Sequence, residues 1–318
     1  MIPLDPDPAR FGLDTRVIPT RLGDVTVRVG PRTGSRALLL LHGAAGSWTT
    51  WTPLLRAAER DGAPLTDVVA IDLSGWGDSP APRCPTSVPD LTRSVAAVLR
   101  AVGYEEWVVI GHSLGGFVAL DLAVREPRAT RAVILVSATG AGVVDAIRRP
   151  LSGGRLVPWF AGMLLAMRFL ALLPAAGSGL LRGLARAGFL APLSAPLFAN
   201  RRAVDPSVPA ALATEIRPKS FLLAARAADA YDLEAWRAIR VPVRALRGEH
   251  DVFAGARDSD GFRDRIADYT EIRLPDAGHF AHIERPDSVL DVLAPVLTAQ
   301  ANGSPASTSA GSPRSSVA

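Results

Sequence analysis

The sequence is almost free of cysteine, which excludes one kind of covalent stabilisation and one kind of metal site. Cys84 is the only cysteine among the 318 residues. A single thiol forms no disulfide within the chain and excludes a zinc site made of cysteine ligands. Tyrosine and methionine are also scarce, with three residues each. Hydrophobic residues nevertheless make up 48% of the chain and charged residues 21%, so the composition is that of a globular protein with a large core.

Lysine is the second scarcity. Lys219 is the only lysine, so the remaining basic residues are arginines. There are 35 basic and 31 acidic residues, which gives a formal net charge of +4. The arginines are scattered among acidic residues and do not form blocks, so we expect no nucleic acid partner.

The chain also lacks a secretory signal pattern. Its first residues, MIPLDPDPAR, contain no basic segment followed by an apolar run, which predicts a cytoplasmic protein. The most apolar stretch, Leu156 to Leu181, has Arg168 near its centre and two prolines, Pro158 and Pro174. These residues disfavour a stable transmembrane span and favour buried or pocket-lining helices, with peripheral contact to a membrane surface as an alternative.

What the chain does have is an alternation of short apolar runs and helical patterns. Continuous apolar runs are typical of parallel strands covered on both faces, and the intervening stripes are typical of helices. The pattern predicts an α/β fold, a mostly parallel sheet with helices on both faces. Pro295 predicts a kink or an early end of the last helix. Two strands are expected within residues 15–29 and single strands at 36–41, 67–72, 106–111, 131–137, 241–247 and 269–274, with helices at 86–102 and 113–126.

About a hundred residues between the expected strands at 131–137 and 241–247 show no strand pattern. Helical patterns occur there at residues 157–173, 180–187 and 221–235. The sequence therefore predicts a helical cap inserted before the acid-bearing strand. The expected organisation is a core from residues 1–139 and 236–300, a cap insertion at 140–235 and a disordered tail at 301–318.

The motif with the clearest chemistry is Gly111-His112-Ser113-Leu114-Gly115. It follows a predicted strand and precedes a predicted helix, which is the setting of a nucleophile elbow. An alternative is that Ser113 is only a helix cap and that the glycines serve packing.

Other strand ends supply the groups that a serine nucleophile needs. His42-Gly43-Ala44 ends the first long apolar strand, where a loop can offer backbone N–H groups to an oxyanion. Asp251 and His279 follow the last two predicted strands, so an acid and a base are expected at the same edge of the sheet.

With these motifs the sequence resembles the α/β-hydrolase superfamily, in particular its cap-bearing esterase, lipase and perhydrolase-like branch. The resembling stretches are LLLLHGAAGSW, IDLSGWGDS, VIGHSLGG, LRGEHDVF and LPDAGHFAHIERP. The resemblance implies Ser113 as nucleophile, His279 as general base and Asp251 as the orienting acid. It implies an oxyanion hole made of the backbone N–H groups of Ala44 and Leu114, and no cofactor.

The remaining candidates surround this site. His42 is expected to brace the oxyanion loop, and a metal site built from His250, Asp251 and His279 explains these residues less well than a triad. The residues expected to contact substrate, with core packing as the alternative, are Trp48, Trp76, Trp159, Met163, Met167 and His282.

The expected function is hydrolysis of a carboxylic ester or thioester with an apolar moiety, through an acyl-enzyme. Apolar residues crowd the segment from Trp159 to Leu170, as they do in ligand pockets. Three alternatives stay open: a carbon–carbon bond hydrolase of diketone-like substrates, a cofactor-free haloperoxidase or perhydrolase, and a ligand-binding protein that keeps the triad as a relic. Ser113 argues against epoxide hydrolases and haloalkane dehalogenases, whose elbows carry an aspartate. The oligomeric state is not predicted.

Overall fold

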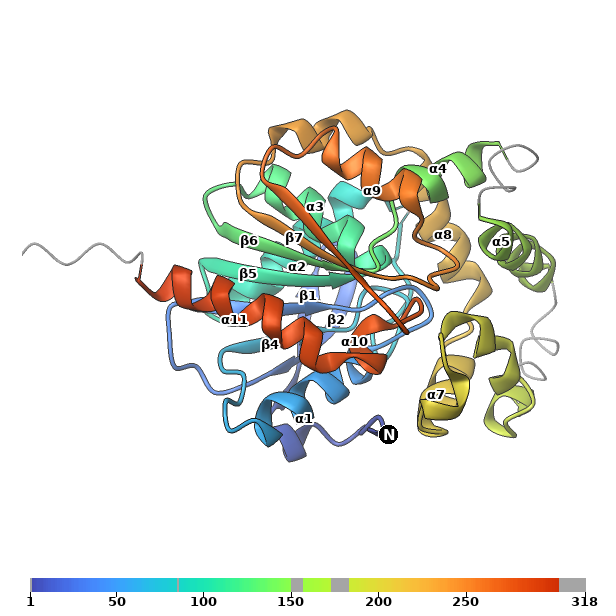
Figure 1. Ribbon diagram of the computed structural model, residues 1–318, viewed down its shortest axis with the longest axis horizontal. Coiled ribbons are helices and arrows are strands. Elements are labelled where there is room, and N and C mark those ends of the chain that lie inside the picture. Colours follow the sequence, from blue (N-terminus) through green and yellow to red (C-terminus); the bar gives the residue numbers. More distant parts are fainter. Residues whose placement is uncertain (1, 85, 150–156, 173–182, 303–318) are drawn as a thin grey trace, which may run out of the picture.

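The computed structural model, which describes residues 2–84, 86–149, 157–172 and 183–302, has an eight-stranded sheet at its centre (Figure 1). The strand order is β1-β2-β4-β3-β5-β6-β7-β8. The two N-terminal strands pair antiparallel, β2 pairs antiparallel with β4, and all later neighbours are parallel. The predicted α/β fold and its mostly parallel sheet are confirmed. The strands are β1 Asp14–Thr20, β2 Gly23–Val29, β3 Arg36–Leu41, β4 Val68–Ile71, β5 Glu106–His112, β6 Thr130–Val136, β7 Val243–Gly248 and β8 Tyr269–Leu274.

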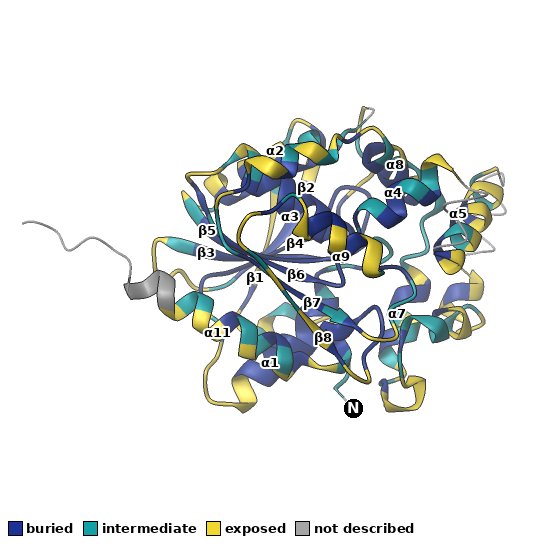
Figure 2. Ribbon diagram, turned by 45° about the horizontal axis from the view of Figure 1, so that its top comes forward, coloured by how far each residue is buried: buried dark blue, intermediate teal, exposed yellow. Residues whose placement is uncertain are grey.

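The central strands are apolar on both faces because helices cover both. In β3, Leu39 and Leu41 point into one core cluster and Leu38 and Leu40 into the other. Side chains alternate between the faces of a strand, so a run of leucines serves both layers. Helices α1 (Thr52–Arg60) and α11 (Pro286–Asn302) cover one face, and α2 (Val88–Ala101), α3 (Leu114–Arg125) and α9 (Ala256–Arg263) cover the other, as Figure 2 also shows by their buried sides.

Between β6 and β7 the described residues contain helices and no strand. The longer ones are α4 (Ala141–Arg148), α5 (Pro158–Ala171), α7 (Ser207–Thr214) and α8 (Pro218–Asp229). Figure 1 places them together at one end of the sheet. Because α4 follows the carboxyl end of β6 directly, this is the edge where the parallel strands end. A further short α-helix, α10, spans Ala281–Glu284. The short 3-10 helices are η1 Pro8–Phe11, η2 Trp48–Trp51, η4 Ala191–Leu197, η5 Arg201–Ala203 and η6 Leu233–Ala238.

Several predicted boundaries in this segment were wrong. Helices α4 and α7 were not predicted at all, and the helix expected at residues 221–235 is α8 followed by the separate turn η6. Half-buried faces rich in Ala and Gly carry too little contrast for a periodicity argument to find them. Of the helix expected at 180–187, residues 183–186 are helical and residues 180–182 lie outside the described residues.

The last helix corrects another expectation. Helix α11 continues past Pro295 to Asn302, so the proline does not end it. The helix also takes in two residues, 301 and 302, of the tail expected to be disordered, and residues 303–318 lie outside the described residues. Within the described part of the chain, no helix is long and apolar enough to cross a membrane.

Candidate active site

Ser113 sits on a strained turn between β5 and α3. Its backbone has φ 50° and ψ −115°, a conformation that residues with a side chain rarely adopt. The turn is possible because two glycines let the backbones come close. A Cβ on Gly111 would lie 2.5 Å from the carbonyl oxygen of Gly115, and a Cβ on Gly115 would lie 2.2 Å from that of Leu41. The predicted elbow is therefore formed, and it presents Ser113 at the carboxyl edge of the sheet.

His279 and Asp251 come from the loops after the last two strands and are hydrogen-bonded to each other. Nδ1 of His279 lies 2.9 Å from Oδ1 of Asp251 and 3.1 Å from Oδ2. Both side chains are buried, with 4% and 0% exposed. In the neutral ring, an acceptor carboxylate on Nδ1 favours the tautomer with its hydrogen there and its free lone pair at Nε2, which is the tautomer that a general base needs.

The environment of Asp251 favours its ionised form. Burial by itself raises the pKa of this carboxyl, but its interactions with His279 and with two backbone N–H groups together outweigh burial, and the pKa is lowered overall. The backbone N–H groups of Phe253 and Ala254 add two hydrogen bonds to Oδ1, of 2.8 and 2.9 Å. Asp251 is therefore held as a fixed anion beneath His279.

The loop after β3 lies directly beside the elbow. A Cβ on Gly43 would lie 3.0 Å from the Cβ of Ser113. Ala44 and Leu114 both line the cavity that contains Ser113, and neither backbone N–H donates a hydrogen bond to another described residue. His42 braces this loop as predicted, since Nδ1 contacts the Gly43 carbonyl oxygen at 2.7 Å and Nε2 accepts from the Leu73 N–H at 2.9 Å.

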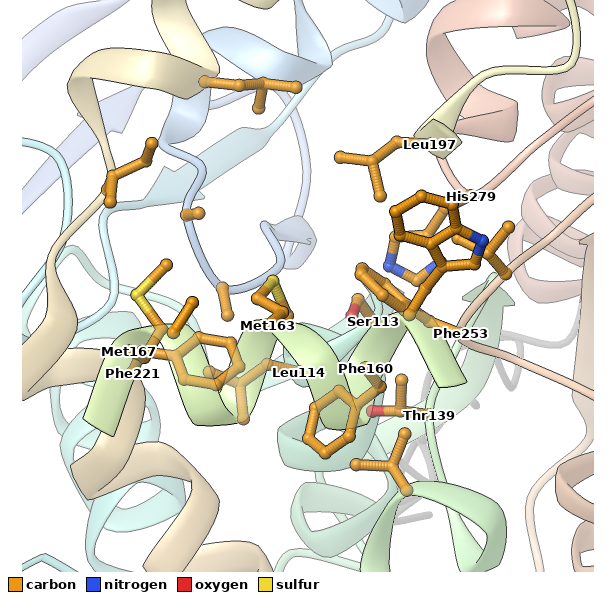
Figure 3. Close-up of a pocket in the computed structure, with 18 of the residues that line it drawn as sticks. Ser113, Leu114, Thr139, Phe160, Met163, Met167, Leu197, Phe221, Phe253 and His279 are labelled. Carbon is orange, nitrogen blue, oxygen red and sulfur yellow. The ribbon is translucent and has the colours of Figure 1, made fainter. Parts of the chain in front are cut away.

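A cavity of about 550 Å³ joins these groups to the cap. Its described walls contain no Asp, Glu, Lys or Arg, and the polar side chains among them are Ser113, Thr139, Ser194 and His279. Figure 3 shows Met163 and Phe160 of α5 facing into the cavity near Ser113, whereas Met167 and Phe221 lie at the end away from His279. The cavity suits an uncharged, apolar molecule.

Three of the six expected substrate contacts line this cavity and three do not. Trp159, Met163 and Met167 form part of the wall. Trp48 and Trp76 are buried elsewhere, Trp48 beneath the guanidinium of Arg28 and Trp76 against the ring of His42. For these two, core packing is the correct interpretation, because aromatic side chains beside a site loop also fill the layer beneath it.

His282 also lies away from the cavity. Its ring is buried between those of Trp51 and His112, with ring centroids 4.4 and 4.5 Å away. His282 lies within α10, which begins at Ala281, whereas His279 precedes the helix, so the two histidines do not share a helical face. Burial lowers the pKa of His282 to about 3, so the ring is neutral. Nε2 of His112 donates to the carbonyl oxygen of His279 at 2.9 Å, and His250 is exposed.

Sequence reasoning missed the partner of two loop carboxylates. Arg28 on β2 is buried and bonds to Asp72 at 3.2 Å and also to Asp78. Asp72 in turn accepts the backbone N–H groups of Trp48 and Asp78, at 2.8 and 3.0 Å. The sequence did contain a signal for this contact. Asp72 and Asp78 flank a short loop that has no basic residue, so a cation from another element was needed to balance their charge.

Two further contacts that were not predicted fasten the cap to the core. Asp258 at the start of α9 accepts the backbone N–H groups of Gly140 and Gly142 at 2.8 and 2.9 Å, and burial raises its pKa to about 6. Arg217 before α8 donates to the carbonyl oxygens of Gly75 and Gly77 in the loop after β4. These bonds fix the roof of the cavity above Ser113.

No group of three or more His, Cys, Asp or Glu side chains among the described residues is arranged to hold a metal ion. The groups at the carboxyl edge are instead the hydroxyl of Ser113, the imidazole of His279 with the carboxylate of Asp251, and two backbone N–H groups. They are grouped around one apolar cavity.

Comparisons with known proteins concern the family and the fold. The family model described as alpha/beta hydrolase fold matches residues 36–286. Uncharacterized protein Rv2715 of Mycobacterium tuberculosis is 37% identical over 105 residues, which is 33% of this chain and 29% of that protein. A 2-hydroxy-6-oxononadienedioate/2-hydroxy-6-oxononatrienedioate hydrolase of Burkholderia vietnamiensis is 30% identical over 126 residues, 39% of this chain and 44% of that one. The chain thus spans less than half the length of these two relatives.

Among solved structures, the epoxide hydrolase CorEH has a TM-score of 0.68 at 20% identity, covering 91% of this chain and 99% of that one. At this identity the likeness concerns the fold alone.

Proposed function

Since the chain belongs to the α/β-hydrolase family, we propose that it is a serine hydrolase that cleaves uncharged carboxylic esters with a large apolar group, through an acyl-enzyme. The observation that carries this proposal is the position of Ser113. It stands on a strained elbow at the wall of an apolar cavity that His279 also lines, and His279 is hydrogen-bonded through Nδ1 to the buried anion of Asp251.

The proposed reaction uses each of these groups once. Ser113 Oγ attacks the ester carbonyl carbon while Nε2 of His279 takes the hydroxyl proton. The negative charge that develops on the carbonyl oxygen is stabilised by the N–H groups of Ala44 and Leu114, each worth about 3 kcal/mol in the transition state. The C–O bond to the alcohol then breaks, and the alcohol leaves with the proton from His279. A water molecule, activated by the same imidazole, releases the acid and restores Ser113.

The cavity supports an ester over the carbon–carbon alternative. The Burkholderia relative is named for a dicarboxylate substrate, and binding a dicarboxylate in a buried site requires cations or many hydrogen-bond donors. The described walls contain no Arg or Lys. An uncharged ester meets no such requirement, and its apolar part gains free energy from burial in these walls.

Hydrolysis of p-nitrophenyl esters by the wild type and by Ser113→Ala tests the proposal. The wild type is expected to hydrolyse them with saturation kinetics, and Ser113→Ala is expected to lose at least about a thousandfold in kcat. Ser194→Ala is the matched control, since Ser194 lines the same cavity without an adjacent base and is expected to keep activity. Equal activity in Ser113→Ala and the wild type would contradict the proposal.

A further inference from the structure

The outer side of helix α5 is apolar and exposed. Leu165 and Phe169 are each 68% exposed and Leu172 just after the helix is 83% exposed. The opposite side of the same helix packs into the cap through Phe160, Leu164 and Met167. A helix that is apolar on all sides is normally covered on all sides, so the exposed half of α5 calls for a partner.

The exposed apolar surface is larger than this one helix. We define the outer cap patch as the exposed side chains at this end of the molecule: Trp159, Leu165, Phe169, Leu172, Phe189 and Leu193. Figures 1 and 2 place α5 and the segment before α7 at the same end of the molecule, opposite the C-terminal end of α11. Trp159 and Leu193 belong to the patch and also line the cavity. The patch and the cavity wall therefore share two residues, so the patch adjoins the cavity.

The charged residues of the two segments that carry the patch have one sign. Within the described cap residues 157–172 and 183–204 the charged side chains are Arg168, Arg186, Arg201 and Arg202. The whole sequence from 146 to 204 contains eight arginines and no Asp or Glu, whereas the rest of the chain has more acidic than basic residues. Residues 146–204 thus depart from the mixing of charge seen over most of the chain.

We propose that the outer cap patch docks on the surface of an anionic lipid membrane, with the apolar side chains inserted among the lipids and the arginines at the headgroups. An amphipathic surface of this composition suits the boundary between headgroups and acyl chains. Each arginine near an anionic surface strengthens binding about fivefold. Because Trp159 and Leu193 belong both to the patch and to the cavity wall, an apolar substrate dissolved in the membrane has an apolar route to Ser113.

A second copy of this chain is the competing partner for an exposed apolar patch. Two such patches facing each other would bring together arginines from both copies, with no acidic side chain in the described part of the patch to offset them. Like charges brought together weaken association, so the charge pattern favours the anionic surface.

Co-sedimentation with vesicles tests the docking surface independently of any catalysis. The full chain is mixed with vesicles of phosphatidylcholine alone or of phosphatidylcholine with about one third phosphatidylglycerol, since anionic lipid is the variable. The variants are Leu165→Glu/Phe169→Glu, which changes apolar residues outside the cavity wall, and Arg168→Gln/Arg186→Gln. The matched control is Val17→Glu/Ile272→Glu, because these residues are also apolar and at least half exposed, at 59% and 50%, but lie on β1 and β8.

The wild type is expected to sediment with the anionic vesicles and far less with the neutral ones. Leu165→Glu/Phe169→Glu is expected to bind at least about tenfold more weakly, Arg168→Gln/Arg186→Gln to lose most of the preference for anionic lipid, and the control to bind as the wild type does. If the control variant bound the vesicles as weakly as Leu165→Glu/Phe169→Glu does, the loss of binding would follow from the added negative charge alone. That result would overturn the proposal. A wild-type dimer in size-exclusion chromatography that Leu165→Glu/Phe169→Glu dissociates would also overturn it, in favour of self-association. Hydrolysis of a short soluble ester, measured in parallel, reports on the proposed reaction separately.

Discussion

Nδ1 of His42 lies 2.7 Å from the carbonyl oxygen of Gly43, its own neighbour in the chain. Because Nε2 of the same ring accepts a hydrogen bond from Leu73, Nδ1 carries the hydrogen and donates it to Gly43. The Gly43 carbonyl and the Ala44 N–H belong to one planar peptide unit and point in opposite directions. Fixing the carbonyl on His42 therefore fixes the direction of the proposed oxyanion donor.

Two substitutions of His42 separate these bonds. The amide nitrogen of Asn approximates the position of Nδ1, and the amide oxygen of Gln approximates that of Nε2. His42→Asn is expected to keep kcat within about tenfold, whereas His42→Gln is expected to lower it by about a hundredfold, as loss of one oxyanion donor does, with KM little changed. Steady-state kinetics on a soluble ester measures both. A larger loss in His42→Asn than in His42→Gln would show that the bond to Leu73 matters more.

Asp251→Asn tests the orienting acid. The Asn oxygen can keep the bonds from Phe253 and Ala254 in the place of Oδ1, which puts the NH₂ group in the place of Oδ2, 3.1 Å from Nδ1 of His279. A donor at that position opposes a hydrogen on Nδ1 and favours the wrong tautomer. We expect kcat to fall by about 10⁴ while the folded structure is retained. Kinetics together with circular dichroism measures both, and full activity in a folded variant would assign the role to another carboxylate.

The cavity predicts a chain-length limit. Adding methylenes to the acyl or alcohol part is expected to raise kcat/KM about fourfold for each one buried, until the cavity is full. Met167 lies at the end away from His279, so Met167→Trp is expected to shorten the longest preferred chain without loss of activity on a short ester. Leu165→Trp, on the outer side of α5, is the control and is expected to leave the profile unchanged. A flat profile in the wild type would mean that the substrate does not occupy the cavity.

Acid stability depends on the neutral ring of His282. Its pKa is lowered to about 3 by burial, whereas in the unfolded chain it has the ordinary value near 6.5. Below that ordinary value the unfolded chain binds a proton that the folded chain does not, so the free energy of unfolding falls as the pH falls. This residue accounts for about 2 kcal/mol between pH 7 and pH 5. Neither ring nitrogen has a hydrogen-bond partner among the described residues.

Urea unfolding of His282→Leu at pH 7 and pH 5 measures this contribution. The variant is expected to lose about 2 kcal/mol less stability than the wild type on acidification. His250→Leu, which replaces an exposed histidine, is the control and is expected to follow the wild type. An identical pH dependence in His282→Leu would mean that other groups determine acid unfolding.

The sequence was sufficient for the sheet and the elbow because both depend on local patterns. Leucine runs that serve two core layers stand out as strands, and Gly111 and Gly115 mark a turn that no larger residue permits. Asp251 and His279 could be placed on one edge because parallel strands end there together.

The rest depends on contacts between distant elements. Arg28 reads as an outward residue of an alternating strand, and only the fold brings Asp72 to it. Trp48 and His282 could not be told from pocket residues by sequence, since an aromatic ring fills a core or a cavity wall equally well. Helix α4 is positioned by Asp258, which lies more than a hundred residues away in the chain.

Covalent labelling of Ser113 tests the central claim most directly. An organophosphonate probe reacts only with a serine that has an activating base and stabilised charge on the adduct. Intact-mass analysis of the folded protein is expected to show a single adduct, peptide mapping to locate it on Ser113, and Asp251→Asn to react far more slowly. No adduct on the folded wild type, or an adduct on Ser194 or another residue, would contradict the account.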